Sequence, residues 1–132
     1  MYLLDTNILI YLQKSRFPGL LHRVKTTPIG ELAVSTFSVA ELVYGCRKSA
    51  CPERNYQALL EFLMPFTIVD FRQEDCGVYG TIRATLEKQG QGIGTIDTFI
   101  AVQALSQGHV LVSHNLREFG RIAGLVVEDW TV

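Results

Sequence analysis

The chain has 132 residues, 48% of them apolar, and we expect residues 1–132 to form a single domain with a substantial core. Its 12 basic and 13 acidic residues give a formal net charge of −1, which excludes the strongly basic surface of indiscriminate nucleic-acid binders. No apolar run approaches the roughly 18 residues of a membrane span, and the N-terminus has no signal-peptide pattern. We therefore expect a cytoplasmic protein with no membrane partner.

The first seven residues organise the prediction. Leu3 and Leu4 are typical of a short buried strand, and Asp5 stands where that strand ends. Thr6 and Asn7 are helix-capping residue types, and an apolar pattern resumes behind them, so a helix should follow. The simplest role for Asp5 is a helix cap, which stabilises by about 1 kcal/mol. This edge of an open α/β sheet is also where ligands bind.

The next elements continue the alternation of helices and strands. Pro18 is suited to the first turn of a short helix, and Leu32–Ser35 is predicted to be a second buried strand. Ser38 and Glu41 form a Ser-x-x-Glu capping box, so a helix is expected to begin there and run to about Lys48. Capping alone is a good explanation of Glu41.

The middle of the chain shows the same pattern. Pro52 can begin another helix, and 66–69 is predicted to be a third strand. Residues 73–89 have apolar positions four apart, which indicates a long amphipathic helix. The glycine-rich stretch 90–94 does not follow a strand and lacks dinucleotide-loop spacing, so it is interpreted as a connection between helices.

The last third of the chain places further polar residues beside strands and helices. Asp97 is predicted in the first turn of a helix that ends at residues 107–108, where its charge would suit the helix dipole. A fourth strand is expected at 110–112 and is followed by Asn115. Residues 125–127 are predicted to be a last strand.

Alternating short strands and amphipathic helices predict a parallel sheet with helices on both faces. Strand ends and the following helix starts then share one edge, where Asp5, Glu41, Asp97 and Asn115 would meet. Clustered carboxylates repel one another, and a divalent cation removes that repulsion. Mg²⁺ and Mn²⁺ prefer such oxygen ligands, whereas the cysteines and histidines lack zinc-site spacing.

The cysteines and histidines have simpler explanations. The cysteines are Cys46, Cys51 and Cys76, and the histidines are His22, His109 and His114. Three cysteines without a C-x-x-C pair are interpreted as small apolar side chains. One histidine, His114, lies beside Asn115 and so within reach of a substrate, although a surface or packing role is the favoured interpretation.

Several motifs in order resemble PIN-domain ribonucleases, and above all the VapC toxins of bacterial toxin–antitoxin pairs. They are Leu-Leu-Asp-Thr-Asn at 3–7, Ser-Val-Ala-Glu-Leu-Val-Tyr-Gly at 38–45, Gly-Thr-Ile-Asp-Thr-Phe-Ile-Ala at 94–101, Asn-Leu-Arg-Glu-Phe at 115–119 and Gly-Leu-Val-Val-Glu-Asp-Trp at 124–130. The likeness covers nearly the whole chain. It implies a PIN-like three-layer α/β/α sandwich around a mainly parallel sheet of four to five strands.

The same resemblance implies Mg²⁺- or Mn²⁺-dependent endonucleolytic cleavage of RNA. It assigns the acidic metal ligands and catalytic residues to Asp5, Glu41 and Asp97. The fourth acidic position of the family falls on Asn115, whose neutral carbonyl would hold a second metal more weakly. Ser113 matches a hydroxyl position that contacts the site, and Thr6 lies beside the first aspartate.

The resemblance also implies partners. Family members are typically homodimers neutralised by a VapB antitoxin, and their usual substrates are structured RNAs, often transfer RNA cut in its anticodon loop. Basic residues that follow the acidic positions are candidates for the RNA path, with a solvated surface role as an equal alternative. They are Arg47, Lys48, Arg54, Arg117 and Arg121.

Two other functions remain open on the sequence alone. A phosphatase related to the haloacid dehalogenases would use Asp5 as its nucleophile, but Asn7 stands where such enzymes have a second acid. A non-catalytic RNA- or partner-binding PIN-like module would have no need of three acidic residues at one edge.

Overall fold

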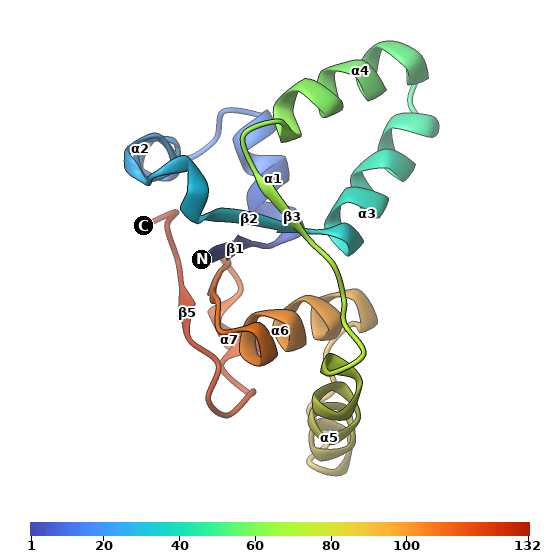
Figure 1. The fold of residues 1–132 in the computed structure, drawn as a ribbon, viewed down its shortest axis with the longest axis vertical. Coiled ribbons are helices and arrows are strands. Elements are labelled where there is room, and N and C mark those ends of the chain that lie inside the picture. The colour runs from blue at the N-terminus through green and yellow to red at the C-terminus, as the bar shows by residue number, and fades with distance from the viewer.

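The computed structural model describes residues 1–132 and shows a five-stranded sheet with helices on both faces (Figure 1). The strands are β1 (Tyr2–Leu4), β2 (Leu32–Ser35), β3 (Thr67–Val69), β4 (Val110–Val112) and β5 (Val127–Glu128). The helices are α1 (Thr6–Gln13), α2 (Pro18–Thr26), α3 (Thr36–Arg47), α4 (Pro52–Leu63), α5 (Asp75–Lys88), α6 (Thr95–Gln107) and α7 (Leu116–Phe119), with a 3-10 turn at Ile29–Glu31. The predicted α/β alternation is confirmed, and β5 lies slightly later in the chain than 125–127.

All neighbouring strands are parallel, in the order β3-β2-β1-β4-β5. β1 therefore lies at the centre, between β2 and β4. Leu4, the last residue of β1, is in register with Val34 of β2 and Val112 of β4. The chain adds β2 and β3 on one side of β1 and then crosses to the other side, so the β1–β4 boundary is the switch point of the sheet.

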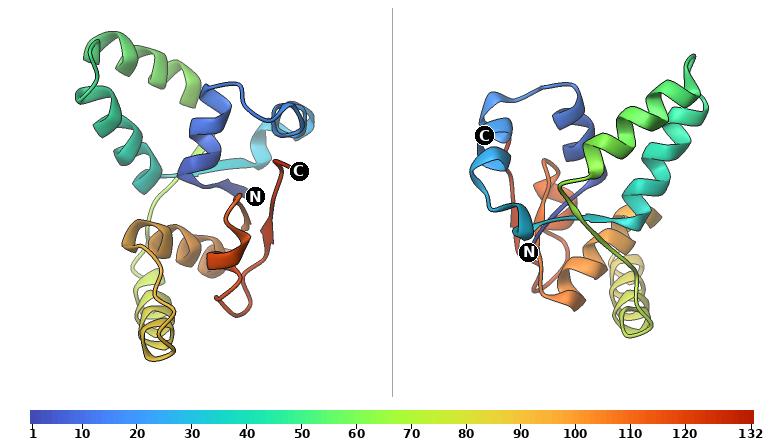
Figure 2. Two further views of the ribbon diagram at one scale, coloured as in Figure 1. Left: turned by 180° about the vertical axis from the view of Figure 1, so that it is seen from behind. Right: turned by 45° about the horizontal axis from the view of Figure 1, so that its top comes forward.

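Two apolar cores cover the two faces of the sheet. One core packs α1, α2, α3 and α4 onto the sheet, and the other packs α5, α6 and α7 onto the opposite face. Figure 1 shows these two layers above and below the strands. The α3–α4 hairpin projects from one end of the molecule and α5 from the other, in both views of Figure 2. This is the three-layer α/β/α sandwich that the sequence predicts.

A buried amide fixes α6 on the sheet. The side chain of Gln103 is fully buried, accepts a hydrogen bond from the Ser35 hydroxyl of β2 and donates one to the backbone oxygen of Val69 at 3.3 Å. One side chain therefore ties α6 to β2 and β3.

None of the helices combines the length and apolar character that a membrane crossing requires.

Candidate active site

Asp5 lies at the switch point, directly after β1. Its Oδ1 accepts a hydrogen bond from the backbone N–H of Ile8 at 2.9 Å, which makes it the N-cap of α1. Its own N–H donates to the backbone oxygen of Val112 at 3.1 Å. The residue is only 5% exposed. Capping therefore accounts for one oxygen of Asp5, and the sheet edge keeps the carboxylate in a largely dry position.

Burial raises the pKa of Asp5 from its ordinary value of 3.8 to about 6, and the negative charges of Asp97 and Asp129 add to this effect. Hydrogen bonds from the Ser113 hydroxyl and from the Ile8 N–H act in the opposite direction. No ion pair of the structure includes Asp5. Ionisation of Asp5 therefore costs more than that of an exposed aspartate, and a nearby cation would relieve this cost.

Asp97 lies in the first turn of α6, as the sequence predicts. Burial raises the pKa of Asp97, and the negative charge of Glu118 raises it further. Asp97 lines a hollow of about 340 Å³, which we call the Asp97 hollow. Its lining residues are Thr6, Asn7, Glu41, Gly94, Thr95, Ile96 and Asp97. Carboxylates from α3 and α6 thus face one space, beside the start of α1.

The predicted capping box at Ser38 and Glu41 is wrong. The N-cap of α3 is Ser35, whose hydroxyl accepts from the Phe37 N–H at 3.0 Å, so the helix begins earlier than expected. Glu41 consequently lies beyond the first turn of α3 and is exposed. The Ser38 hydroxyl instead forms a hydrogen bond with the Thr6 hydroxyl at 2.8 Å. Glu41 is therefore free of a capping role, and Thr6 joins α1 to α3.

Ser113 and Asn115 follow β4, the strand beside β1. The buried Ser113 hydroxyl accepts from the Asn115 N–H at 2.9 Å. The Asn115 Oδ1 accepts from the Glu118 N–H at 3.3 Å and so caps α7. The carbonyl that sequence reasoning offered to a second metal therefore has a structural partner.

Glu118 is an acidic residue near the site that sequence reasoning missed. Its charge reaches Asp97, although it lies on α7 and not at a strand end. The pattern Asn-x-x-Glu at 115–118 could have predicted its position, because it has the spacing of a helix cap followed by an acidic residue in the first turn.

The arrangement suits a hard cation only in part. No three His, Cys, Asp or Glu side chains lie close enough together to enclose a metal ion. The donor set nevertheless consists of carboxylate oxygens, which Mg²⁺ and Mn²⁺ prefer. None of the ion pairs in the structure includes Asp5, Glu41, Asp97 or Glu118. Uncompensated negative charge and the raised pKa of two carboxyl groups are what a divalent cation would relieve.

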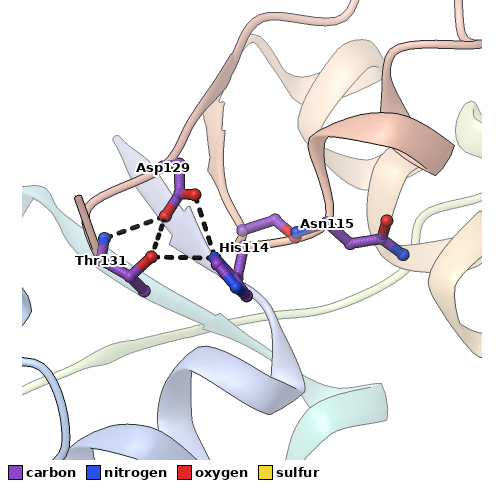
Figure 3. Close-up of polar contacts among 5 residues, drawn as sticks. His114, Asn115, Asp129 and Thr131 are labelled. Carbon is purple, nitrogen blue, oxygen red and sulfur yellow. Dashed lines mark hydrogen bonds and ion pairs between the residues drawn. The ribbon is translucent and has the colours of Figure 1, made fainter.

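A second hollow, of about 270 Å³, shares Asn7 with the Asp97 hollow, and we call it the His114 hollow. Its lining residues are Asp5, Asn7, Tyr11, His114 and Asn115. Figure 3 shows His114 beside Asp129 and Thr131, with Asn115 directed away from them. The His114 Nδ1 lies 3.0 Å from the Asp129 Oδ2 and 2.9 Å from the Thr131 Oγ1.

The basic residues proposed for an RNA path have diverse surroundings. Arg47 pairs with Glu53 at 2.6 Å, and the Arg121 guanidinium donates to the backbone oxygens of Gln91 and Gly92 at 3.4 and 3.3 Å. Lys48 lines a larger hollow between α1, α3 and α4 that continues from Glu41. The exposed Arg54 and Arg117 form no ion pair. Lys48 is thus the member of this group that shares a hollow with an acidic site residue.

Comparison with known proteins identifies the family. The PIN domain family matches residues 2–125. Ribonuclease VapC2 of Haemophilus influenzae is 46% identical over 129 residues, which cover 98% of this chain and 97% of that protein. The chain belongs to the PIN domain family. This PIN domain is also 36% identical to the tRNA(fMet)-specific endonuclease VapC of Shigella flexneri, with 98% of each chain covered.

Solved structures agree with the fold of this PIN domain. VapBC-1 from nontypeable Haemophilus influenzae matches with a TM-score of 0.92 and 39% identity, over 99% of this chain and 98% of that one. DNA-bound VapBC from Salmonella typhimurium matches with a TM-score of 0.91 and 36% identity, over 98% of this chain and 97% of that one. The VapC-like PIN fold that the motifs suggested is therefore confirmed.

Proposed function

We propose that this PIN domain is a divalent-metal-dependent endoribonuclease and the toxin of a toxin–antitoxin pair. The observation that carries the proposal concerns Asp5, at the switch point of the sheet, and Asp97, whose charge acts on it: both have a raised pKa and neither is in an ion pair. Names of similar proteins support the activity, since ribonuclease VapC2 and a tRNA(fMet)-specific endonuclease are among them.

Asp5, Asp97 and Glu41 would hold Mg²⁺ or Mn²⁺, with Glu118 close to Asp97. When bound, the ion polarises a phosphoryl oxygen and lowers the pKa of the attacking water. The Ile8 N–H and the Ser113 hydroxyl hold the Asp5 carboxylate in place. The hydrogen bond between Thr6 and Ser38 holds the start of α1 against α3, which sets the spacing between Asp5 and Glu41.

The reaction is hydrolysis of a phosphodiester bond. Water adds to phosphorus in line with the departing oxygen, the bond from phosphorus to the 3′ oxygen breaks, and the products are a 3′-hydroxyl and a 5′-phosphate. A carboxylate of the chain accepts the proton that the water loses, and the departing 3′ oxygen takes up a proton to become the hydroxyl. Unpaired loops of RNA suit an open hollow better than A-form stems, because loops expose their bases and backbone. We therefore propose a structured RNA such as transfer RNA as the substrate.

The proposed protein partner is a VapB-type antitoxin. The solved structures similar to this chain include DNA-bound VapBC from Salmonella typhimurium and VapBC-1 from nontypeable Haemophilus influenzae. The hollow that contains Lys48 extends from Glu41 between α1, α3 and α4, so an antitoxin segment lying there would reach the acidic residues. We also propose a homodimer and a single domain across residues 1–132.

End-mapping of total RNA after brief induction of the chain tests this function. The parent should produce new 5′-phosphate ends at one site in a structured RNA, and Asp97→Asn should produce none. Co-expression of the adjacent reading frame should restore growth and co-purify with the chain. Equal cleavage by the parent and the variant would reject the assignment of Asp97.

A further inference from the structure

Three aromatic rings from separate segments meet beside Asp5. The centroids of the Tyr11 and Phe17 rings lie 5.1 Å apart, edge to face. The His114 ring lies 5.8 Å from Phe17 and 6.3 Å from Tyr11. Tyr11 belongs to α1, Phe17 to the connection before α2, and His114 follows β4. Long-range packing therefore assembles this cluster.

The His114 ring is held in one orientation yet remains half exposed. Its Nδ1 is bound by Asp129 and Thr131, as Figure 3 shows, and Asp129 is itself held by Thr131. The His114 side chain is 50% exposed, whereas that of Asp129 is 8% exposed. The structure fixes an imidazole with an accessible part beside Asp5.

The backbone adopts an uncommon conformation to complete the cluster. Phe17 has a φ of 55°, in the left-handed region that costs a non-glycine residue energy. It packs against both Tyr11 and His114 in this conformation. The surrounding contacts therefore hold the ring that supports His114 from the protein side.

The chemistry of the His114 hollow suits a nucleobase better than a phosphate. No lysine or arginine lines it, so its wall offers a phosphate no cationic side chain. The half-exposed His114 imidazole and the Tyr11 ring offer a planar base a surface to pack against. The side chains of Asn7 and Asn115 add amide groups to the wall. The Asn115 Oδ1 is occupied by the cap of α7, so its NH₂ group remains as a donor.

We propose that the His114 hollow binds the base of the nucleotide next to the bond that is cut, packed against the imidazole of His114. The Asn115 NH₂ group donates a hydrogen bond to an acceptor on the base edge. This inference rests on the proposed RNA cleavage at Asp5. It makes His114 a residue that positions substrate, and it predicts a base preference at one position of the RNA.

The test uses a short single-stranded RNA that spans the mapped cleavage site, with each base in turn replaced by an abasic residue. Binding is measured by fluorescence anisotropy in EDTA, and cleavage is measured separately with Mn²⁺. Removing one base beside the cut bond should weaken binding to the parent about tenfold, as expected for the loss of one stacked base. His114→Ala should bind the intact RNA about tenfold more weakly, and the abasic change should then have little further effect.

Two variants distinguish stacking from other roles. His114→Phe keeps a ring without nitrogen atoms and should retain binding close to that of the parent. His22→Ala removes an exposed histidine of α2 that lines neither hollow, and it should match the parent. Thermal unfolding of each variant confirms that it folds.

Outcomes that overturn the subsite differ from those that overturn the nuclease. If removing the base weakens RNA binding by the same factor in the parent and in His114→Ala, the subsite is rejected. It is also rejected if His114→Phe binds the intact RNA as weakly as His114→Ala does. If the purified parent binds this RNA in a base-dependent way but does not cleave it with Mn²⁺, the subsite is supported, the mapped ends come from another nuclease, and the proposed nuclease activity is rejected.

Discussion

Burial raises the pKa of Asp5, and the negative charge of Asp97 raises it further, so the first turn of α6 acts electrostatically on the N-cap of α1. These residues come from distant parts of the chain and from helices on opposite faces of the sheet. Each carboxylate has a local role at a helix start. The burial of both carboxylates and the repulsion that Asp97 exerts on Asp5 are costs to folding that helix capping does not require, and they are the physical basis of the proposed cation site.

Asp5→Asn should stabilise the protein near neutral pH. The pKa of Asp5 is about 6 in the folded state and near 3.8 in the unfolded state, so the folded state binds more protons between these values. Parent stability therefore falls as the pH rises through this window. Two pKa units correspond to about 3 kcal/mol, and the asparagine keeps the oxygen that caps α1.

Urea unfolding in EDTA measures this effect. The gain in the free energy of unfolding should be largest above pH 7 and nearly absent at pH 4. Asp70→Asn removes an exposed carboxylate and serves as the control. A gain of the same size at both pH values would contradict the account of Asp5.

Mn²⁺ should raise the melting temperature of the parent, because a ligand that binds only the folded state stabilises it. Asp97→Asn should lose most of this increase. Asp5→Asn, although more stable in EDTA, should gain little from Mn²⁺. Differential scanning calorimetry with and without EDTA measures all three, and equal Mn²⁺ shifts in the parent and both variants would exclude these aspartates as ligands.

Glu118→Gln should weaken Mn²⁺ binding by about fivefold to tenfold, which corresponds to about 1 kcal/mol of charge interaction at a partly exposed site. The variant also removes the charge that adds to the raised pKa of Asp97. Isothermal titration calorimetry provides the affinity. Glu61→Gln removes the charge of an exposed residue on α4 and should leave the Mn²⁺ affinity unaltered. An unchanged affinity in Glu118→Gln would place Glu118 outside the cation site.

Gln103→Leu should lower the free energy of unfolding by about 1–3 kcal/mol, because it leaves the buried Val69 carbonyl and Ser35 hydroxyl without their partner. Urea unfolding measures the loss. Gln57→Leu changes an exposed glutamine of α4 and should alter stability by less than about 0.5 kcal/mol. Equal stability of the two variants would show that the buried amide adds nothing to the attachment of α6.

Local patterns predicted much of the fold. The apolar run and capping residues at 3–7 placed Asp5 at the end of β1, and the position of Asp97 in the first turn of α6 was predicted equally well. Ser38 misled the prediction, because Ser-x-x-Glu fits a cap while the actual cap is Ser35. The contact that Ser38 makes instead, with Thr6, depends on how α1 and α3 pack.

Tertiary packing also decides the features that the sequence did not reveal. The order of the strands depends on which face of the sheet each crossover helix covers. The spacing of apolar residues along the sequence does not determine that face. The contact between His114 and Asp129 joins the ends of β4 and β5, and it requires that these strands be neighbours. Glu118 reaches Asp97 only because α7 turns back at the end of β4.

Cleavage of a structured RNA by the purified chain tests the central claim most directly. The rate should be measured with Mn²⁺, with Mg²⁺ and with EDTA, for the parent and for Asp5→Asn, Glu41→Gln and Asp97→Asn. We predict metal-dependent cleavage by the parent, with the rate at least about 100-fold lower in each folded variant. Cleavage that persists in EDTA, or that Asp5→Asn and Asp97→Asn perform as fast as the parent, would contradict it.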